Sequence, residues 1–377
     1  MTRVPIAALL FAGCALPPGA PVEKLPVAFA EPRRVLAGAM PVVVAAGDFD
    51  GDGKLDLAVG DETAGTVTAL LGRGDGTFTA AAPALAGALP SALAAADLDG
   101  DGRLDLVVGL GDHNVTPSPG AIAALLGRGD GTFDALAPVQ VAPPGVSWAC
   151  DRVRVGDLDR DGKPDVVASC ETAQVPGQFD VALYSLRQTG GGHFASAVRV
   201  ADDPGLQACA LELADVNRDG ALDALFVGGV ALGDGAGGFR PLAATGARAY
   251  DAIVSGDFTG TGSIDLASSD EERVALSLGR GDGSFAAPLT FATGASPWDL
   301  AAADFDGDRR LDLAVANYDG FSVTLLIGAP GGTFAASLNF SVGEQHPSSV
   351  AAGDFDGDGR VDLAVADRQS VYVLLNR

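Results

Sequence analysis

Short apolar runs alternate with acidic loops and glycine turns along most of the chain. In the first such unit, apolar segments at residues 42–46, 55–59 and 66–71 are followed by a poorer segment at 78–85. The first gap holds the acidic stretch Asp48 to Asp56, and the last holds a Gly-Asp-Gly turn of the kind that joins hairpin strands. Runs this short predict β-strands rather than helices. Each unit is therefore predicted to be a four-stranded antiparallel meander.

The acidic stretch recurs seven times, at intervals of 42 to 60 residues. The copies begin at Asp48, Asp97, Asp157, Asp215, Asp257, Asp304 and Asp354. Repeats of about 40–50 residues with four strands each are typical of β-propeller blades. The 52 glycines also suit a turn-rich all-β protein. The sequence therefore predicts an all-β fold, a seven-bladed β-propeller of four-stranded antiparallel blades.

The two ends of the chain are predicted to share the last blade. The seventh copy stops at Arg377, after its third apolar segment, and residues 27–36 look like a fourth strand without the preceding three. An N-terminal strand that completes the last blade would close the ring and remove the open sheet edges.

The repeated unit also resembles a known family. The pattern VAAGDFDGDGKLDLAVG followed by VTALLGRGDGTF is similar to the FG-GAP or VCBS-type repeat, found in integrin α-chain propellers and in many exported bacterial proteins. The resemblance covers residues 27–377. It implies a seven-bladed propeller with Ca²⁺ in the loops between the first and second strands of a blade.

The acidic loops are candidate calcium sites. Ca²⁺ prefers six to eight oxygen ligands, which the carboxylates at positions 1, 3, 5 and 9 and the backbone carbonyl at position 7 could supply. Glycine at position 6 permits the sharp bend that such a loop needs. The expected ligands are Asp48, Asp50, Asp52, Lys54 and Asp56; Asp97, Asp99, Asp101, Arg103 and Asp105; Asp157, Asp159, Asp161, Lys163 and Asp165; Asp215, Asn217, Asp219, Ala221 and Asp223; Asp304, Asp306, Asp308, Arg310 and Asp312; Asp354, Asp356, Asp358, Arg360 and Asp362.

The seven loops differ in their expected affinity. Asn217 replaces an aspartate in the Asp215 loop, and Arg309 stands at the glycine position of the Asp304 loop. The Asp257 loop has Thr259 and Thr261 at positions 3 and 5 and is predicted to be free of metal. We expect five or six bound Ca²⁺ ions. The alternative for any loop is an acidic turn without metal.

Charge narrows the range of functions. The formal net charge is −25, and 25 of the 49 acidic residues occupy the aspartate positions of the loops. This charge argues against nucleic acid or an anionic membrane surface as a partner. The chain has only three histidines and three lysines, a thin supply of groups for acid–base catalysis.

The N-terminus has the pattern of an export signal. Residues 1–14 contain a basic residue, an apolar stretch and small residues before Cys14. This end resembles a bacterial lipobox, in which the cysteine is lipidated; the alternative is a secretory signal with an incidental cysteine. Residues 15–26 are predicted to be a proline-rich tether. We therefore expect an exported protein of the cell envelope, held at a membrane surface only through a lipid on Cys14.

Two further cysteines flank the third acidic loop. Cys150 precedes Asp157 by seven residues, and Cys170 follows Asp165 by five. If the loop joins two antiparallel strands, the two side chains end near each other, and an exported protein can oxidise them. A disulfide between Cys150 and Cys170 is predicted, with Cys209 left over. The alternative is three small buried apolar side chains.

The rare aromatic residues indicate a second surface. Trp148, Tyr250 and Trp298 lie where a fourth strand hands over to the next blade, on the face expected to be opposite the acidic loops. The longest connections, 109–120 and 170–179, are expected on that face too. Aromatic rings beside carboxylates suit sugar stacking and hydroxyl hydrogen bonds; the alternative is packing between blades. The candidate ligand-binding residues are Trp148, Tyr250, Asp251, Trp298, Asp299 and His346.

Arg-Gly-Asp occurs three times, at Arg73, Arg128 and Arg280. It could be interpreted as an adhesion motif. All three copies fall at the same turn between third and fourth strands, which favours a hairpin role instead.

Three functions remain open. The favoured one is a monomeric, non-enzymatic, calcium-stabilised surface module that binds a protein or a glycan. A structural spacer without its own ligand is the first alternative. An enzyme is the second, because similar propellers occur in polysaccharide lyases.

Overall fold

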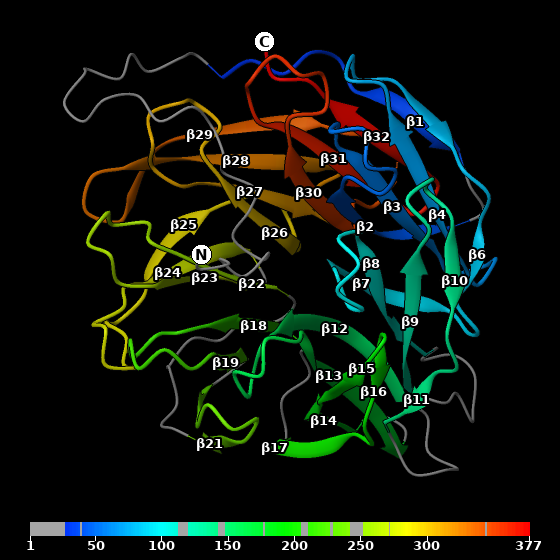
Figure 1. The fold of residues 1–377 in the computed structure, drawn as a ribbon. Helices are drawn as coiled ribbons and strands as arrows, with labels where there is room; N and C mark the ends of the chain where they lie inside the picture. The colour runs from blue at the N-terminus through cyan, green and yellow to red at the C-terminus, as the bar shows by residue number, and fades with distance from the viewer. Residues whose placement is uncertain are drawn as a thin grey trace.

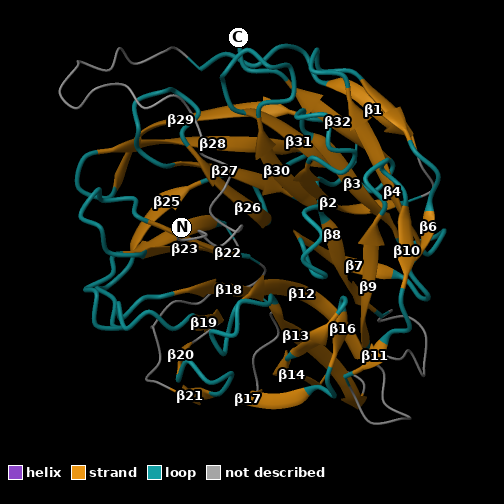
Figure 2. Ribbon diagram, viewed as in Figure 1, coloured by secondary structure: helices purple, strands orange, loops and turns teal. Residues whose placement is uncertain are grey.

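The computed structural model describes residues 27–37, 40–111, 120–141, 148–175, 178–204, 210–226, 229–241, 252–270, 272–343 and 345–377. Within these residues every regular element is a β-strand (Figure 2). None of them forms a helix of the length and apolarity that a membrane span needs. The strands form seven blades around a ring (Figure 1), which confirms the predicted fold class.

The first three blades follow the predicted meander. Blade 1 contains β2 (Pro41–Gly47), β3 (Asp56–Asp61), β4 (Thr66–Gly72), β5 (Phe78–Ala80) and the short β6 (Ala84–Leu85). Blade 2 contains β7 (Pro90–Ala96), β8 (Asp105–Leu110), β9 (Ala121–Gly127), β10 (Phe133–Ala135) and the short β11 (Val139–Gln140). Blade 3 contains β12 (Trp148–Gly156), β13 (Asp165–Val175), β14 (Gln178–Leu186) and β17 (Val198–Pro204), with the hairpin of β15 (Gln188–Gly190) and β16 (His193–Phe194) inserted before β17.

The remaining four blades repeat the same order. Blade 4 contains β18 (Leu211–Ala214), β19 (Asp223–Phe226), β20 (Gly229–Gly233) and β21 (Phe239–Pro241). Blade 5 contains β22 (Ile253–Gly256), β23 (Asp265–Asp270), β24 (Arg273–Ser277) and β25 (Leu289–Ala292). Blade 6 contains β26 (Pro297–Ala303), β27 (Asp312–Asn317), β28 (Ser322–Ala329) and β29 (Thr333–Ser341). Blade 7 contains β30 (Ser349–Gly353), β31 (Asp362–Ala366), β32 (Ser370–Leu374) and β1 (Arg33–Ala37).

The N-terminal strand completes the seventh blade, as the sequence predicts. β1 pairs antiparallel with β32, with Arg33 opposite Val373 and Ala37 opposite Ser370, and the two strands lie side by side in Figure 1. An isolated bridge between Phe29 and Asn376 extends the contact. The two ends of the chain therefore close the ring in one sheet.

The strand order puts all seven acidic loops on one face of the ring. Each loop joins the first strand of its blade to the antiparallel second strand, as Asp48–Asp56 joins β2 to β3. The turns from second to third strands, and the connections to the next blade, lie at the other ends of these strands. We call these two surfaces the acidic face and the opposite face.

The hydrophobic core lies between the blades. Seven clusters of buried side chains are found among the described residues, one between each pair of neighbouring blades. Successive side chains of a strand point to opposite faces of a sheet. Both faces of a blade are covered by its neighbours, so the second strands are buried on both sides. In β3, Leu57 and Val59 pack toward blade 7, and Ala58 packs toward blade 2.

Two details of the expected strands are wrong. The outer strand expected at 78–85 is split into β5 and β6 around Pro83, which lacks the N–H that a ladder requires. The connection expected at 170–179 is mostly strand, because β13 and β14 pair from Val166 opposite Leu186 to Val175 opposite Gln178. Its polar residues and the Pro176-Gly177 pair favour a loop by local rules, but the pairing with the neighbouring strand extends through most of it.

Candidate metal centres and the opposite face

The aspartate at position 9 of each loop is a buried anchor. One carboxylate oxygen of Asp56 accepts the N–H of Phe49 at 2.7 Å, and the other accepts the N–H of Gly72 at 2.7 Å. The first bond closes the acidic loop, and the second fastens the end of the third strand to it. Equivalent pairs of bonds are made by Asp105, Asp165, Asp223, Asp312 and Asp362. Asp265 differs in one partner, since it accepts the N–H of Thr259, at position 3, together with that of Gly279.

The aspartate at position 1 folds the loop around itself. Asp48 accepts the N–H of Gly51 at 2.8 Å on one oxygen and that of Gly53 at 3.0 Å on the other. In the sixth loop Arg309 replaces the second glycine. It adopts the same left-handed backbone, with φ of 69°, and donates its N–H to Asp304 at 2.7 Å. The substitution therefore preserves the loop at the cost of backbone strain.

Five loops bring three carboxylates together, with one oxygen of each lying within 4.8 Å of the others. These loops are the five that carry four aspartates. Oxygens that share one calcium ion at about 2.3–2.6 Å must lie within about 5 Å of one another, so the all-oxygen donor sets fit this ion. The clustered residues are Asp48, Asp50 and Asp56; Asp97, Asp99 and Asp101; Asp157, Asp159 and Asp165; Asp304, Asp306 and Asp308; Asp354, Asp356 and Asp362.

The residue at position 7 contacts the carboxylate at position 5. Lys54 donates its backbone N–H to Asp52 at 2.9 Å and its ammonium to the same carboxylate at 2.6 Å. Arg310 pairs with Asp308 in the same way. The basic side chain thus offsets part of the negative charge on the outer side of the loop. The equivalent backbone bond is made by Arg103, Lys163, Ala221 and Arg360.

The two departing loops keep the backbone and change the donors. In the fourth loop Asn217 accepts the N–H of Asp219 at 2.9 Å and donates its own amide to the carboxylate of Asp219 at 2.9 Å. In the fifth loop the hydroxyl of Thr259 contacts Asp257 at 3.1 Å and the hydroxyl of Thr261 at 2.9 Å. Hydroxyl groups that bond each other replace the carboxylates there.

Burial raises the pKa of the position-9 carboxyl groups, against the opposing effect of their backbone hydrogen bonds. Other carboxylates of the same loop raise the pKa further. The pKa rises to about 6 in Asp56, Asp105 and Asp165 and to about 7 in Asp312 and Asp362. Closely spaced, partly desolvated carboxylates favour a bound divalent cation.

Sequence reasoning missed the role of position 2. The apolar side chain at this position packs between its own blade and the next, so each of the seven clusters receives one. Phe49, for example, joins the cluster between blades 1 and 2. The signal was present, because every copy has an apolar residue here. The seven residues are Phe49, Leu98, Leu158, Val216, Phe258, Phe305 and Phe355.

The Arg-Gly-Asp segments serve as turns. Asp75 accepts the N–H and the hydroxyl of Thr77, at 2.9 and 2.5 Å, and Asp130 does the same with Thr132. The glycine that follows Asp75, Gly76, donates its N–H to the carbonyl of Phe355 in blade 7 at 3.1 Å. These turns therefore also tie neighbouring blades together.

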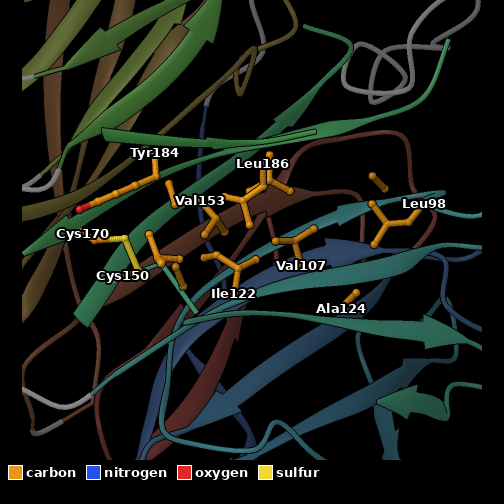
Figure 3. Packing of buried hydrophobic residues seen from close by; sticks show 14 of the residues in the cluster. Leu98, Val107, Ile122, Ala124, Cys150, Val153, Cys170, Tyr184 and Leu186 are labelled. Atoms are coloured by element: carbon orange, nitrogen blue, oxygen red, sulfur yellow. A yellow bond between two sulfur atoms is a disulfide. The ribbon is translucent and has the colours of Figure 1, made fainter. Parts of the chain in front are cut away.

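Cys150 and Cys170 form a disulfide, the pair expected from their spacing. The bond joins β12 to β13, with a Cα–Cα distance of 4.0 Å. Both cysteines are buried in the cluster between blades 2 and 3, beside Val153 and Tyr184 (Figure 3). The disulfide thus fixes the two strands that carry the Asp157 loop.

On the opposite face, three of the candidate ligand-binding residues lie among the described side chains. Trp298 is near the start of β26 and stacks on Tyr318, which in turn stacks on His346. Asp299 accepts the N–H of Val350 at 2.9 Å and so links blades 6 and 7. Tyr250, Asp251, the side chain of Trp148, Cys14, Cys209 and the segments 1–14 and 15–26 lie outside the described residues.

Several solved structures share the fold. A structure of BBS1N in complex with ARL6DN has a TM-score of 0.62 at 12% identity, covering 94% of this chain and 98% of that chain. A lectin of Agrocybe aegerita, described as recognising non-reducing terminal N-acetylglucosamine, has a TM-score of 0.53 at 18% identity, covering 88% and 86%. A functionally unknown protein of Desulfotomaculum acetoxidans has a TM-score of 0.51 at 9% identity, covering 87% and 88%. These likenesses support the fold alone.

Comparison with curated proteins finds no match. The sequence profile of the FG-GAP-like repeat, by contrast, matches residues 33–108, 109–168, 257–315 and 304–365, together more than half of the chain. These segments contain the acidic loops of blades 1, 2, 3, 5, 6 and 7. The chain therefore belongs to the family of FG-GAP-like repeat proteins.

Proposed function

We propose that the protein is an exported, calcium-stabilised propeller that binds a protein or glycan ligand on its opposite face without chemical conversion. The observation that carries this proposal is that the two faces of the ring present different kinds of side chain. The carboxylate clusters lie on one face, and the exposed aromatic rings Trp298 and Phe321 lie on the other.

Calcium would be held by the five clusters with four aspartates and, more weakly, by the Asp215 loop. An ion that binds the folded loops and not the unfolded chain stabilises the fold. Removal of calcium is therefore expected to lower the melting temperature by many degrees. The measurement is thermal unfolding in excess calcium and after passage over a chelating resin; identical curves would contradict the metal assignment.

Export is proposed from residues 1–14, and lipid attachment from Cys14. The disulfide supports an oxidising compartment, since such bonds are rare in a reducing cytosol. Mass spectrometry of the protein recovered from the envelope fraction tests both points. Cleavage before Cys14 with added acyl mass is the expected result, and an intact Met1 would contradict export.

Binding without turnover separates the proposal from its rivals. The calcium-loaded protein is applied to neutral glycans, uronate glycans and a displayed peptide library, while unsaturated products are followed by their ultraviolet absorbance. Retention without product supports the binding module. Product release would indicate a lyase. A folded protein that binds none of the glycans or peptides would indicate a spacer.

A further inference from the structure

Four aromatic rings form a continuous row on the opposite face of blade 6. Trp298 contacts Tyr318 at a centroid distance of 4.9 Å, Tyr318 stacks on His346 at 4.3 Å, and His346 contacts Phe321 at 4.8 Å. The interplanar angles of these contacts are 32°, 19° and 38°. Tyr318 and His346 therefore stack inside the row, and Trp298 and Phe321 lie tilted at its ends.

The end rings are exposed to solvent. Trp298 is 36% exposed and Phe321 is 41% exposed. They are two of the five large hydrophobic side chains found exposed in the described part of the chain, and the only two of these five that contact the same ring system. Exposed apolar surface that gathers in one place marks an interaction site more often than scattered residues do.

Polar groups border the row. Asp319, with 58% of its side chain exposed, accepts the hydroxyl of Ser296 at 2.5 Å and lies 3.7 Å from Nδ1 of His346. Arg368 donates to the hydroxyl of Tyr318 at 3.2 Å and pairs with Glu62 of blade 1 at 3.3 Å. A hydrogen-bond acceptor, Asp319, and a donor, Arg368, thus contact the residues of the row.

The backbone of this surface is strained. Among the described residues, six that are not glycine adopt a left-handed backbone. Arg160, Arg218 and Arg309 belong to acidic loops. The other three, Ser296, Phe321 and Arg368, all belong to the aromatic row or its polar border. Such strain is costly for a bulky residue and tends to collect where a ligand is held.

We propose that this row is a subsite for a neutral sugar ring. A pyranose would stack its C–H face on the exposed ring of Trp298 or Phe321, whose π-face carries partial negative charge. Its hydroxyl groups would donate to Asp319 and accept from the donors beside it. The inference rests on the proposed binding function and names its ligand class.

Two other ligand classes fit less well. The border of the row carries the carboxylates of Asp319, beside His346, and Glu62, which pairs with the guanidinium of Arg368, so an anionic sugar would meet uncompensated negative charge at Asp319. A quaternary ammonium is usually enclosed by rings on several sides. The row presents exposed rings only at its two ends, Trp298 and Phe321, and does not form such an enclosure.

Fluorescence isolates the proposed site. The chain has two tryptophans, so in a Trp148→Phe variant all tryptophan emission comes from Trp298. The calcium-loaded variant is titrated with soluble oligosaccharides of neutral β-glucan, mannan and chitin, and with oligogalacturonate as the anionic arm. We expect a saturable change in emission with at least one neutral oligosaccharide and none with oligogalacturonate.

Variants then separate a binding role from packing between blades, with their affinities measured by calorimetric titration because the Trp298 variants lack the fluorescent ring. Phe321→Gly removes an end ring and also relieves a left-handed backbone, so it is expected to weaken sugar binding about tenfold without lowering the melting temperature. Trp298→Ala is expected to weaken binding at least as much, and Trp298→Phe to restore most of it. Leu85→Ala, which removes an exposed apolar side chain from blade 1, away from the row, is the control and is expected to leave affinity unchanged.

The outcomes distinguish this inference from the proposed function. Absence of binding to every neutral oligosaccharide, or equal affinities of the parent and both ring-deleted variants, would overturn the sugar subsite. Binding confined to the displayed peptides would overturn it too, while leaving the binding module intact. Absence of binding to every oligosaccharide and every peptide would overturn both the sugar subsite and the proposed binding function.

Discussion

At the scale of single residues, an acidic loop contains two kinds of carboxylate, the buried one at position 9 and the others nearer the loop surface. In the first loop, the carboxylates at positions 3 and 5 are not fully buried, and Asp50 accepts the N–H of Asp52 within the loop. The carboxylate at position 9 is fully buried and bridges two strands. Because Asp265 keeps this bridge in a loop with few other carboxylates, its structural role is independent of metal.

Paired substitutions test this division. Asp265→Ala leaves two buried N–H groups without a partner, so we expect a loss of about 2–4 kcal/mol in the free energy of unfolding, with or without calcium. Asp50→Ala is expected to reduce only the stabilisation that calcium adds. Denaturant unfolding of both variants in each condition is the measurement, and a calcium-dependent effect at Asp265 would refute the distinction.

The raised pKa values predict an inverted pH dependence for calcium-free protein. A carboxyl group whose pKa is higher in the folded state than in the unfolded state binds more protons when folded, so its ionisation destabilises the fold. The values of about 6 to 7 at Asp56 and Asp312 place this loss between about pH 4 and pH 7.

Melting temperatures of resin-stripped protein should therefore fall as the pH rises through that window. In excess calcium the trend should reverse, because the ion requires ionised carboxylates. A melting temperature of the stripped protein that rises steadily from pH 4 to pH 7 would show that the buried carboxyl groups ionise without cost.

At the scale of elements, each acidic loop also serves the interface with the next blade. The apolar residue at position 2 enters the core between blades, while its neighbours at positions 1 and 3 face the candidate metal site. The candidate metal site and the packing between blades therefore share one backbone segment, so order in one would support order in the other.

Phe305→Ala tests the packing half of this arrangement. Phe305 is 3% exposed and packs between blades 6 and 7. Its truncation is expected to cost about 3–5 kcal/mol, the usual range for a buried phenylalanine. Leu85→Ala, at 71% exposure, is the control and should change stability by less than about 0.5 kcal/mol. Comparable losses in the two variants would contradict the assignment.

At the scale of the whole molecule, closure by β1 determines whether the ring has open edges. Without β1, the outer edge of β32 would present unpaired backbone groups, which favour association with other chains. β1 and β32, the first and last strands, pair with each other in a register that runs from Arg33 opposite Val373 to Ala37 opposite Ser370.

Deletion of residues 1–37 is expected to lower the melting temperature and to produce oligomers. Size-exclusion chromatography with light scattering measures the association. A synthetic peptide of residues 27–37, added in excess, should restore the monomer, whereas a peptide of the same composition in scrambled order should not. A deleted chain that stays monomeric and equally stable would argue against closure by this strand.

Local rules were sufficient for the blades and the loops. The short apolar runs, the Gly-Asp-Gly turns and the aspartate spacing all act over a few residues, so the sequence determined the strand order, the number of blades and the carboxylates that meet in each loop. The Cys150–Cys170 pair followed from the same hairpin geometry. The split of the outer strand at Pro83 was also within reach of these rules.

Only the tertiary structure decided what assembles across blades. Trp298 comes from β26, Tyr318 and Phe321 from the turn between β27 and β28, and His346 from the connection between β29 and β30, while Arg368 reaches the row from the next blade. No spacing rule links such residues, because their proximity depends on the angle between neighbouring sheets and on strained turns. Repetition along the chain therefore determined the scaffold and its acidic loops, while the non-repeating surface took shape only when the ring closed.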